Sequence, residues 1–227
     1  MKRRCTKGAW LLLALASGAQ ATSLDVAVAQ DGSYRMRVTS LKEARFATTL
    51  RQKYDFSCGS AALATLLTFH YDRPISEQAV FAEMFQAGDR SKISKQGFSL
   101  LDMKHYLNAH GYSADGFEQP VERLAQERLP AIVLLSERGY RHFVVVKGLS
   151  RGRVLVGDPA MGTRAMSIER FKSLWVNNIL FVIHNRREQA RFDLAADWRI
   201  APSSPLELSI VRDDRLDTLP VRRAGSF

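Results

Sequence analysis

The amino-acid sequence predicts an α+β fold in which a helical lobe packs against an antiparallel sheet. Apolar residues at helical spacing dominate the region between residues 58 and 110. Apolar runs of strand length, divided by glycines, follow between residues 131 and 183. Because the helices precede the strands instead of alternating with them, the sequence favours segregated layers over a parallel α/β sheet.

The first 21 residues are expected to be a signal peptide. A basic start precedes an apolar stretch over residues 9–16, which is too short to span a membrane, and Ala19 and Ala21 supply the small residues before a cleavage site. We predict cleavage after Ala21 and a periplasmic location, with an uncleaved anchor as the alternative. No later segment reaches spanning length, so an integral membrane protein is not expected.

Removal of the signal peptide changes how the charge and the cysteines are interpreted. The net charge of +10 falls to about +6, because four basic residues and no acidic ones are lost. The remaining charges are interspersed, which does not favour nucleic acid as a partner. Cys5 leaves with the signal peptide, so Cys58 is the one cysteine of the expected mature chain. An unpaired thiol in an oxidising compartment is either reactive or buried and inert.

A predicted hairpin and three predicted helices come first along the expected mature chain. Residues 23–39 alternate around Asp31-Gly32 and predict a β-hairpin, so residues 22–47 form an N-terminal extension. Residues 58–70 are apolar on nearly every side, which is typical of a buried helix. Helices are also expected over residues 77–86, capped by Ser76, and over residues 99–110, ended by Gly111.

The strands and the end of the chain follow. Strands are predicted at residues 131–135, 142–147, 153–156 and 178–183, with a short helix at residues 168–175. After Arg186 the sequence is polar and holds three prolines, so residues 187–227 are expected to be a C-terminal extension, in which residues 193–199 or 206–211 can dock locally. The main domain therefore covers residues 48–186.

Cys58 stands where a thiol can be activated. The first turn of a helix lies at the positive end of its dipole, which lowers the pKa of a thiol there. A neighbouring imidazole can hold the proton and form a thiolate–imidazolium pair. Among five histidines, His142 is the best candidate because it starts a strand after the loop at residues 139–141, where a side chain reaches the edge of a site.

Two further residues complete a possible cysteine hydrolase site. Asp158 ends the strand after that of His142, and adjacent antiparallel strands bring the two together, so that Asp158 orients the imidazole. Gln52 precedes the helix of Cys58, and its amide with the Cys58 backbone N–H can bind the oxyanion of an acyl intermediate. Taken singly, each of these residues also fits a plain structural or surface role.

Three sequence blocks resemble those of the bacteriocin-processing, papain-like cysteine peptidases that cut after double-glycine leaders. They are Gln52-x5-Cys58-Gly59, His142-Phe-Val-Val-Val-x-Gly148 and Asp158-Pro159-x2-Gly162, and Phe171-x3-Trp175 resembles the segment that follows. The resemblance covers about residues 48–184. It implies a papain-like fold, Cys58 as nucleophile, His142 as base and acid, Asp158 as orienter and Gln52 as oxyanion donor. We expect no cofactor and no metal.

The chain departs from that family in three respects. Ser57 stands where many members have aspartate, there is no Gly-x4-Gly-Lys-Ser/Thr nucleotide loop, and the expected signal peptide directs the chain out of the cytoplasm. A stand-alone, exported member resembles the peptidases of functional-amyloid (Fap-type) secretion systems. We therefore expect an exported cysteine endopeptidase that processes a secreted or amyloid-system polypeptide, co-encoded with it.

Other functions remain open at this point. A leader-binding, non-proteolytic module of a secretion system is the main alternative, although such relatives typically lose the cysteine. The other four histidines, His70, His105, His110 and His184, lack ligand-like spacing for a metal. A serine hydrolase is not favoured because no Gly-x-Ser-x-Gly elbow is present. Another acyl transfer by a thiol, such as an amidase or transglutaminase-like reaction, would use the same triad.

Overall fold

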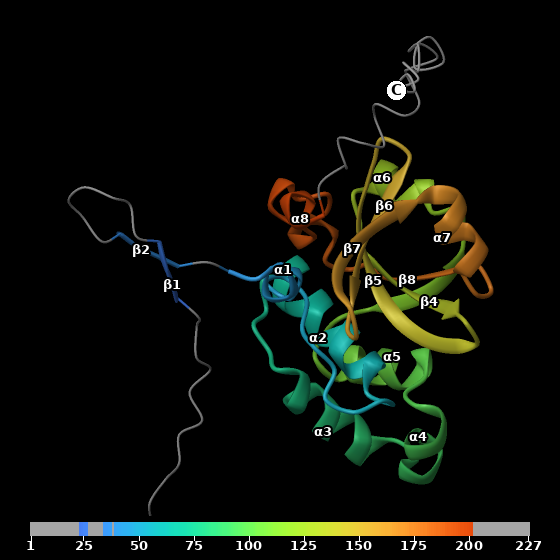
Figure 1. The fold of residues 1–227 in the computed structure, drawn as a ribbon. Coiled ribbons are helices and arrows are strands. Elements are labelled where there is room, and N and C mark those ends of the chain that lie inside the picture. The colour runs from blue at the N-terminus through green and yellow to red at the C-terminus, as the bar shows by residue number, and fades with distance from the viewer. Residues whose placement is uncertain (1–22, 27–33, 38, 202–227) are drawn as a thin grey trace, which may run out of the picture. The chain divides into compact units, whose positions relative to one another are not determined.

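The computed structural model describes residues 23–26, 34–37 and 39–201, which fall in two compact units, residues 1–40 and 41–227. In the first unit, β1 (Ser23–Val26) pairs antiparallel with β2 (Tyr34–Arg37) (Figure 1). The Asp31-Gly32 turn and the expected signal peptide lie outside the described residues.

A six-stranded antiparallel sheet forms the centre of the second unit, in the order β3-β8-β4-β5-β6-β7. Consecutive strands from β4 to β7 are joined as hairpins. The turn between β4 and β5 and the turn between β6 and β7 therefore lie at the same end of the sheet. The strands are β3 (Ala114–Glu118), β4 (Ala131–Glu137), β5 (Tyr140–Ser150), β6 (Arg153–Asp158), β7 (Gly162–Ser167) and β8 (Ile179–Ile183).

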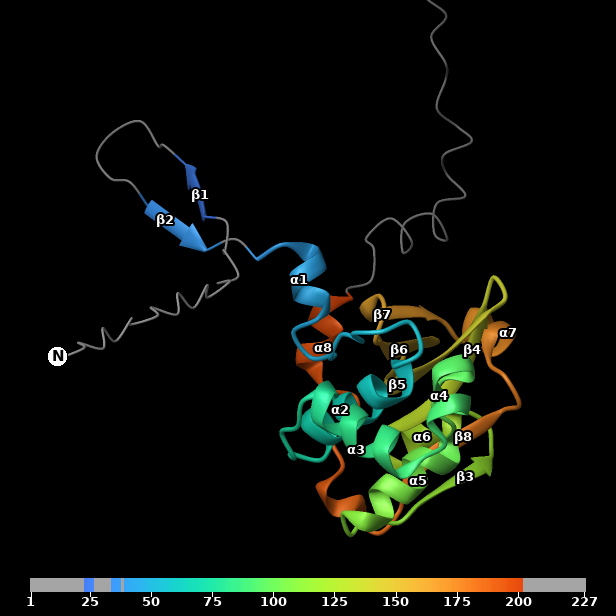
Figure 2. The same ribbon diagram turned by 90° about the horizontal axis from the view of Figure 1, so that it is seen from below.

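Helices cover both faces of this sheet. The helices α2 to α5 lie together on one side, with α2 innermost against β5 (Figures 1 and 2). The short helices α6 and α7 lie on the other side. The helices are α1 (Leu41–Arg45), α2 (Cys58–His70), α3 (Glu77–Ala87), α4 (Arg90–Gln96), α5 (Leu100–Ala109), α6 (Glu122–Glu127), α7 (Ile168–Leu174) and α8 (Ala195–Ile200).

The two covered faces explain why the strands are almost continuously apolar. Val145 and Phe181 pack with α2 on one face, whereas Val144 and Val146 pack with α6 and α7 on the other. Alternate residues of a strand point to opposite faces, so a sheet buried on both sides needs apolar residues throughout. This core holds α2, and therefore Cys58, against the sheet.

The predicted α+β class is confirmed, and α2 has the predicted bounds. The sequence reasoning missed α1, α4, α6, β3 and β7. The two strands, Ala-Asp-Gly-Phe-Glu and Gly-Thr-Arg-Ala-Met-Ser, carry little apolar alternation. They are the two edges of the sheet and form because β8 and β6 offer them unpaired backbone groups.

The segment after Arg186 docks on the second unit. It contains a 3-10 turn (Arg187–Gln189) and α8, which lies beside α1 (Figures 1 and 2). The Lys147 ammonium, which is fully buried, donates to Asp197 Oδ1 of α8 at 2.9 Å. The last part of the described chain therefore supplies the counter-charge of a core lysine.

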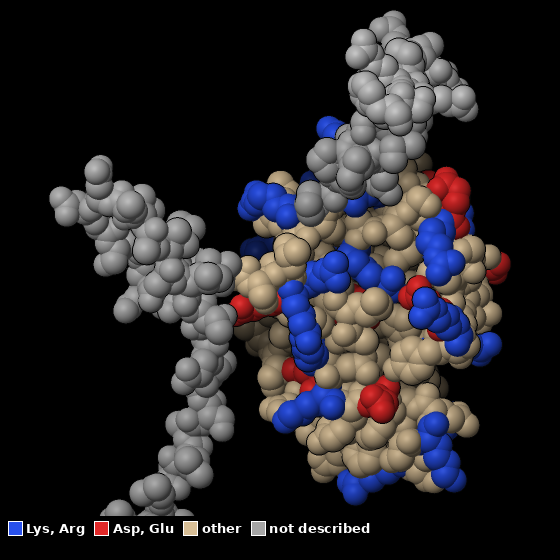
Figure 3. All heavy atoms as spheres, in the orientation of Figure 1, with Lys and Arg blue, Asp and Glu red and all other residues tan. Residues whose placement is uncertain are grey.

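The distribution of charge and the lengths of the helices complete the description. Lys and Arg side chains are spread over the face seen in Figure 3, with Asp and Glu among them. Within the described ranges, every helix is too short or too polar to cross a bilayer.

Candidate active site

Cys58 is the first residue of α2 and is 8% exposed. Its neighbour Gly59 is required by close packing, because a Cβ there would lie 2.9 Å from Phe98 Cβ and 3.0 Å from Met103 Cε. The Cys-Gly pair thus lets the start of α2 sit tightly against the segment that leads into α5.

The loop before Cys58 is held by Ser57. The buried Ser57 hydroxyl accepts the backbone N–H groups of Lys53 and Tyr54, and it donates to the Tyr54 carbonyl. An aspartate at this position could accept the same two N–H groups while adding a negative charge next to the thiol. Ser57 therefore keeps the loop turn and leaves out that charge.

The electrostatic surroundings of Cys58 differ from those expected. Burial raises the pKa of the thiol, the backbone N–H groups of Phe143, Gly59 and Cys58 itself lower it, and the Asp158 carboxylate raises it; the net direction is upward. The helix start does lower the pKa, as predicted, but desolvation outweighs it, so the predicted net depression is wrong. A thiolate here needs a cationic partner.

His142 lies on β5, directly before Phe143, whose N–H reaches the Cys58 sulfur. His142 Nε2 is 3.0 Å from Asp158 Oδ2, and both side chains are buried. His142 Nδ1 is buried too and has no hydrogen-bond partner among the described residues. One ring nitrogen is thus held by a carboxylate, and the other is left for the thiol or a substrate.

Asp158 is fully buried and well supplied with donors. Its Oδ1 accepts the N–H groups of Ala160 at 2.9 Å and Met161 at 3.2 Å, which closes the turn between β6 and β7. Gly162 ends that turn with φ +79°, a conformation that favours glycine. The Asp-Pro-x-x-Gly block therefore encodes a turn that fixes the carboxylate.

Arg164, which the sequence reasoning missed, also contacts Asp158. Its Nη2 donates to Asp158 Oδ2 at 3.0 Å and to Glu137 Oε2 at 3.1 Å. Burial alone would raise the pKa of Asp158, but the hydrogen bond and charge of His142, then the charge of Arg164 and the Ala160 N–H, bring it below its usual value. Asp158 is therefore an anion that accepts from a histidine and an arginine.

Gln52 lies at the start of the loop, near the Asp158 turn. Its backbone N–H donates to the Pro159 carbonyl at 3.1 Å, and its Nε2 donates to the Tyr54 carbonyl at 3.1 Å. Its Oε1 is buried without a partner in the described part of the chain. The structure therefore brings the loop of Gln52 to the end of β6 that carries Asp158.

Tyr140 is a second residue that the sequence reasoning missed. Its ring stacks on that of His142, with centroids 5.4 Å apart and 21° between the planes, and its hydroxyl donates to the Asp55 carbonyl at 2.9 Å. Both residues lie on β5, two positions apart, which places their side chains on one side of the strand. That spacing was visible in the sequence and could have identified Tyr140.

An aromatic cluster borders the loop on its other side. Tyr54, Phe56 and Phe81 are in mutual ring contact, and Phe81 also contacts Phe85 and Phe98. The Tyr54 side chain is 49% exposed. The loop that leads to Cys58 thus presents apolar surface to solvent.

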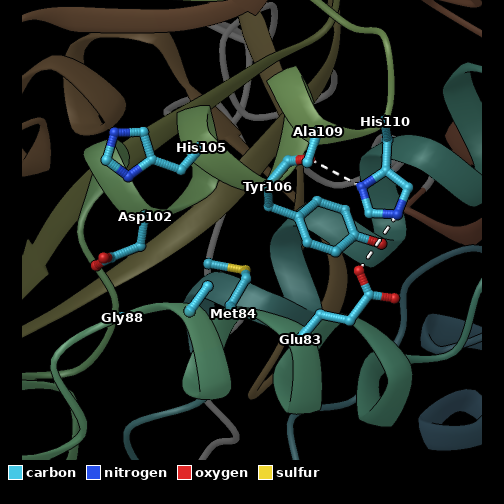
Figure 4. A pocket seen from close by; sticks show the side chains of 9 residues that line it. Glu83, Met84, Gly88, Asp102, His105, Tyr106, Ala109 and His110 are labelled. Carbon is cyan, nitrogen blue, oxygen red and sulfur yellow. Dashed lines mark hydrogen bonds and ion pairs between the residues drawn. The ribbon is translucent and has the colours of Figure 1, made fainter.

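A separate pocket of about 110 Å³ lies between α3 and α5 (Figure 4). His110 Nε2 is 3.2 Å from Glu83 there, while His105 points away from His110. Within the described residues, no group of three or more His, Cys, Asp or Glu side chains could hold a metal ion. The lining of this pocket includes no cysteine and no residue of the Cys58 region, so the pocket is separate from the candidate active site.

The Cys58 region has the components of nucleophilic acyl chemistry. A thiol at a helix start, an imidazole held by an anionic carboxylate, and an amide-bearing loop lie within one set of contacts. Such a set can form and hydrolyse a thioester without a metal or an organic cofactor.

Comparison with known proteins covers most of the second unit. The sequence model of the Peptidase C39 family matches residues 47–187. The chain is 42% identical over 174 residues to the "Probable functional amyloid protease FapD" of Pseudomonas aeruginosa and 38% identical to that of Pseudomonas fluorescens, covering 76% of each chain in both cases. It is 26% identical to the lactococcin-G-processing and transport protein LagD of Lactococcus lactis, over 57% of this chain and 18% of LagD.

Solved structures with a similar chain path are peptidase domains. The peptidase domain of Streptococcus ComA, a bifunctional ABC transporter, gives a TM-score of 0.49 at 23% identity, covering 60% of this chain and 97% of that domain. A double-glycine motif protease in complex with a leader peptide gives 0.48 at 24% identity, covering 60% and 91%.

Proposed function

This chain belongs to the Peptidase C39 family and is a cysteine peptidase, and we propose that it is an exported endopeptidase with a Cys58–His142–Asp158 triad. The observation that carries the proposal is the state of His142. Its Nε2 is paired with the buried carboxylate of Asp158, and its Nδ1 has no hydrogen-bond partner in the part of the chain that the structure describes. The N–H of the next residue, Phe143, reaches the Cys58 sulfur.

The reaction begins with proton transfer from Cys58 to His142 Nδ1. Burial disfavours an isolated thiolate, so the imidazolium that forms beside it provides the compensating charge, and anionic Asp158 stabilises that imidazolium. The thiolate attacks the peptide carbonyl, and His142 then gives the proton to the leaving amine. Water, deprotonated by His142, hydrolyses the thioester and releases Cys58.

Gln52 and the Cys58 backbone N–H are the proposed oxyanion donors. Gln52 Nε2 carries two hydrogens, and the Tyr54 carbonyl needs one of them. The second hydrogen bonds the Tyr140 hydroxyl in the free protein, and it would turn to the oxyanion if the tetrahedral intermediate forms between the loop and the start of α2. The Cys58 backbone N–H is fixed by the start of α2, and a donor fixed in this way stabilises such an intermediate without reorganisation at the moment of attack.

The proposed substrate is a co-encoded, exported polypeptide of an amyloid or secretion system. The relatives named as functional amyloid proteases support this substrate class. The exposed edge of the aromatic cluster at Tyr54 would accept apolar side chains of such a chain. Export through the N-terminal residues 1–21 would bring enzyme and substrate into one compartment.

The test compares exported polypeptides by mass spectrometry in cells with the wild-type protein, Cys58→Ala or His142→Gln. Because both variants remove the thiolate–imidazolium pair, cleavage should fall by at least about 10⁴-fold and uncut precursors should accumulate. His105→Gln, an exposed histidine on α5, is the matched control and should cleave normally. The same spectra should show the enzyme itself beginning at Thr22.

Identical N-termini of all exported polypeptides in wild type and Cys58→Ala would contradict the proposal. If secretion were also unaffected by that variant, the chain would act as a leader-binding module. Alkylation of Cys58 with iodoacetamide at about pH 6 gives an independent measure of how far the thiol is activated. A Cys58 that reacts no faster there than free cysteine would contradict the ion pair.

A further inference from the structure

Tyr140 contacts three separate parts of the proposed catalytic site. We propose that it is a positioning residue, which holds the His142 ring and the loop of Gln52 in one arrangement. The inference rests on the proposed function, since it assigns Tyr140 a role in that reaction. It concerns alignment of the other groups, not contact with the reacting atoms.

The first contact limits the motion of the base. The Tyr140 ring covers one face of the His142 imidazole in a nearly parallel stack, while Asp158 holds Nε2 at the ring edge. A terminal ring torsion of histidine is broad when nothing contacts the ring. The stacking contact with Tyr140 and the hydrogen bond to Asp158 together hold the His142 ring, so that its Nδ1 points in one direction.

The second contact reaches the loop. The Tyr140 hydroxyl donates to the Asp55 carbonyl at 2.9 Å, which joins residues 85 positions apart in the chain. Lys53, Tyr54 and Asp55 are exposed and form the outer part of this loop. The bond therefore ties the exposed part of the loop to the beginning of β5.

The third contact involves the proposed oxyanion donor. Burial raises the pKa of the Tyr140 hydroxyl, a hydrogen bond from the Gln52 side chain lowers it, and the negative charges of Cys58, Asp55 and Asp158 raise it. The net direction is upward, so the hydroxyl stays protonated at neutral pH and continues to donate to Asp55. One phenol group thus contacts both the amide of Gln52 and the backbone of its loop.

An alternative role follows from exposure. Tyr140 is 46% exposed, so its outer face could instead contact the substrate and contribute only to binding. A binding contact changes KM, whereas a misaligned oxyanion loop changes kcat. Alkylation separates the parts further, because a thiolate attacks iodoacetamide without forming an oxyanion.

The experiment uses the full-length protein and a synthetic peptide spanning the cleavage site identified with Cys58→Ala. Tyr140→Phe keeps the stack and removes the hydroxyl. We expect kcat to fall about tenfold with KM within about twofold, since a donor that is displaced but present costs less than the 10²–10³-fold loss of a deleted donor. The pH dependence of Cys58 alkylation should equal that of the wild type.

Tyr140→Leu removes the stack as well. Its kcat should fall further than that of Tyr140→Phe, and its alkylation profile should shift because the imidazole is no longer held. Tyr112→Phe, at a buried tyrosine between α5 and β3, is the matched hydroxyl deletion and should leave both measurements unchanged. If Tyr140→Phe folds poorly, Tyr140→Trp takes its place, because it also keeps an aromatic ring without the phenol. Its kcat should then fall about tenfold, with KM within about twofold of the wild type.

Wild-type kcat in Tyr140→Phe, or a change confined to KM, would overturn the inference. An altered pH dependence of Cys58 alkylation in Tyr140→Phe would contradict the assignment of the loop contact to the hydroxyl and of the His142 contact to the ring. Failure of the proposed function is distinguishable, because no cleavage site that depends on Cys58 would then be found, whereas failure of this inference leaves cleavage by the wild type and its loss in Cys58→Ala intact.

Discussion

At the residue scale, the buried carboxylate of Asp158 has more partners than a triad requires. Four donors surround its two oxygens: His142 Nε2, Arg164 Nη2 and two backbone N–H groups. A buried anion with this number of donors stays ionised and fixed in direction. Arg164 therefore stabilises both the fold and the orientation of the proposed base.

Arg164→Gln tests that contribution. Removing one charged donor from a buried carboxylate should lower the free energy of unfolding by about 1–3 kcal/mol at neutral pH. The lowered folded-state pKa of Asp158 gives stability that is present above the unfolded-state value and is lost as the pH falls through the folded-state value. The difference between variant and wild type should therefore narrow below about pH 3.8. Urea unfolding at neutral and acidic pH measures both effects.

Arg170→Gln is the control for Arg164→Gln. Arg170 also pairs with Glu137, but its side chain is 55% exposed, so the loss should be below about 1 kcal/mol. Equal losses in the two variants would show that the contact with Asp158 adds nothing beyond a surface ion pair.

Sequence reasoning proposed four candidate residues, mostly from local signals. Cys58 opens an apolar helix, His142 lies near the start of a strand and Asp158 ends one. Arg164 had no such signal, since its contact depends on β7 pairing with β6, where Arg164 lies opposite Val156. The net effect of burial on the Cys58 thiol was also beyond the sequence, because it depends on packing around the helix start.

At the element scale, the end of α2 is joined to the segment that leads to α8. His70, the last residue of α2, lies with Nδ1 2.6 Å from the Arg191 carbonyl, and its own carbonyl accepts the Arg191 N–H at 2.9 Å. Its Nε2 is buried without a partner among the described residues. The imidazole is therefore neutral, with the proton on the nitrogen that donates to Arg191.

Acid should weaken this junction. Burial and the charge of Lys147 lower the pKa of His70 to about 4, against the Arg191 carbonyl and Asp197, which raise it, while the charge of Arg191 lowers it slightly. Since the unfolded state takes up the proton first, stability is complete above about pH 6.5 and is lost as the pH falls towards 4. The expected slope approaches about 1.4 kcal/mol per pH unit, measured by urea unfolding across this range.

His70→Asn is the comparison, because it can donate to the Arg191 carbonyl and does not titrate. Its unfolding free energy should depend less on pH between about 6.5 and 4 than that of the wild type. Parallel pH dependences of the two proteins would exclude His70 as the source of the slope.

The long elements were predictable and the short ones were not. The residues of α2 and of β4, β5 and β8 carry enough apolar residues for their period to be recognised. By contrast, α4 and α6 have only Ile93 and Leu124, respectively, as buried residues. Such elements are specified by packing onto the rest of the fold, which the local sequence does not reveal.

At the scale of the whole molecule, the second unit contains both apolar cores and all the proposed catalytic residues. The expected boundary of the N-terminal extension near residue 47 can be tested with a variant that begins at Thr39 and so lacks both strands of the first unit. Its melting temperature should stay within about 2 °C of that of a variant that begins at Thr22, since no core residue is removed. Cleavage of the synthetic peptide should also persist; a large loss of thermal stability would show that β1 and β2 belong to the core.

The buried pair between Lys147 and Asp197 has a consequence for how the chain is made. Lys147 lies in the middle of the sheet, yet its counter-charge is encoded 50 residues later, close to the end of the described chain. Until α8 has emerged, closing the core would bury an ammonium group without its carboxylate, which costs several kcal/mol. The core around Lys147 would therefore close only after the chain has been synthesised beyond Asp197.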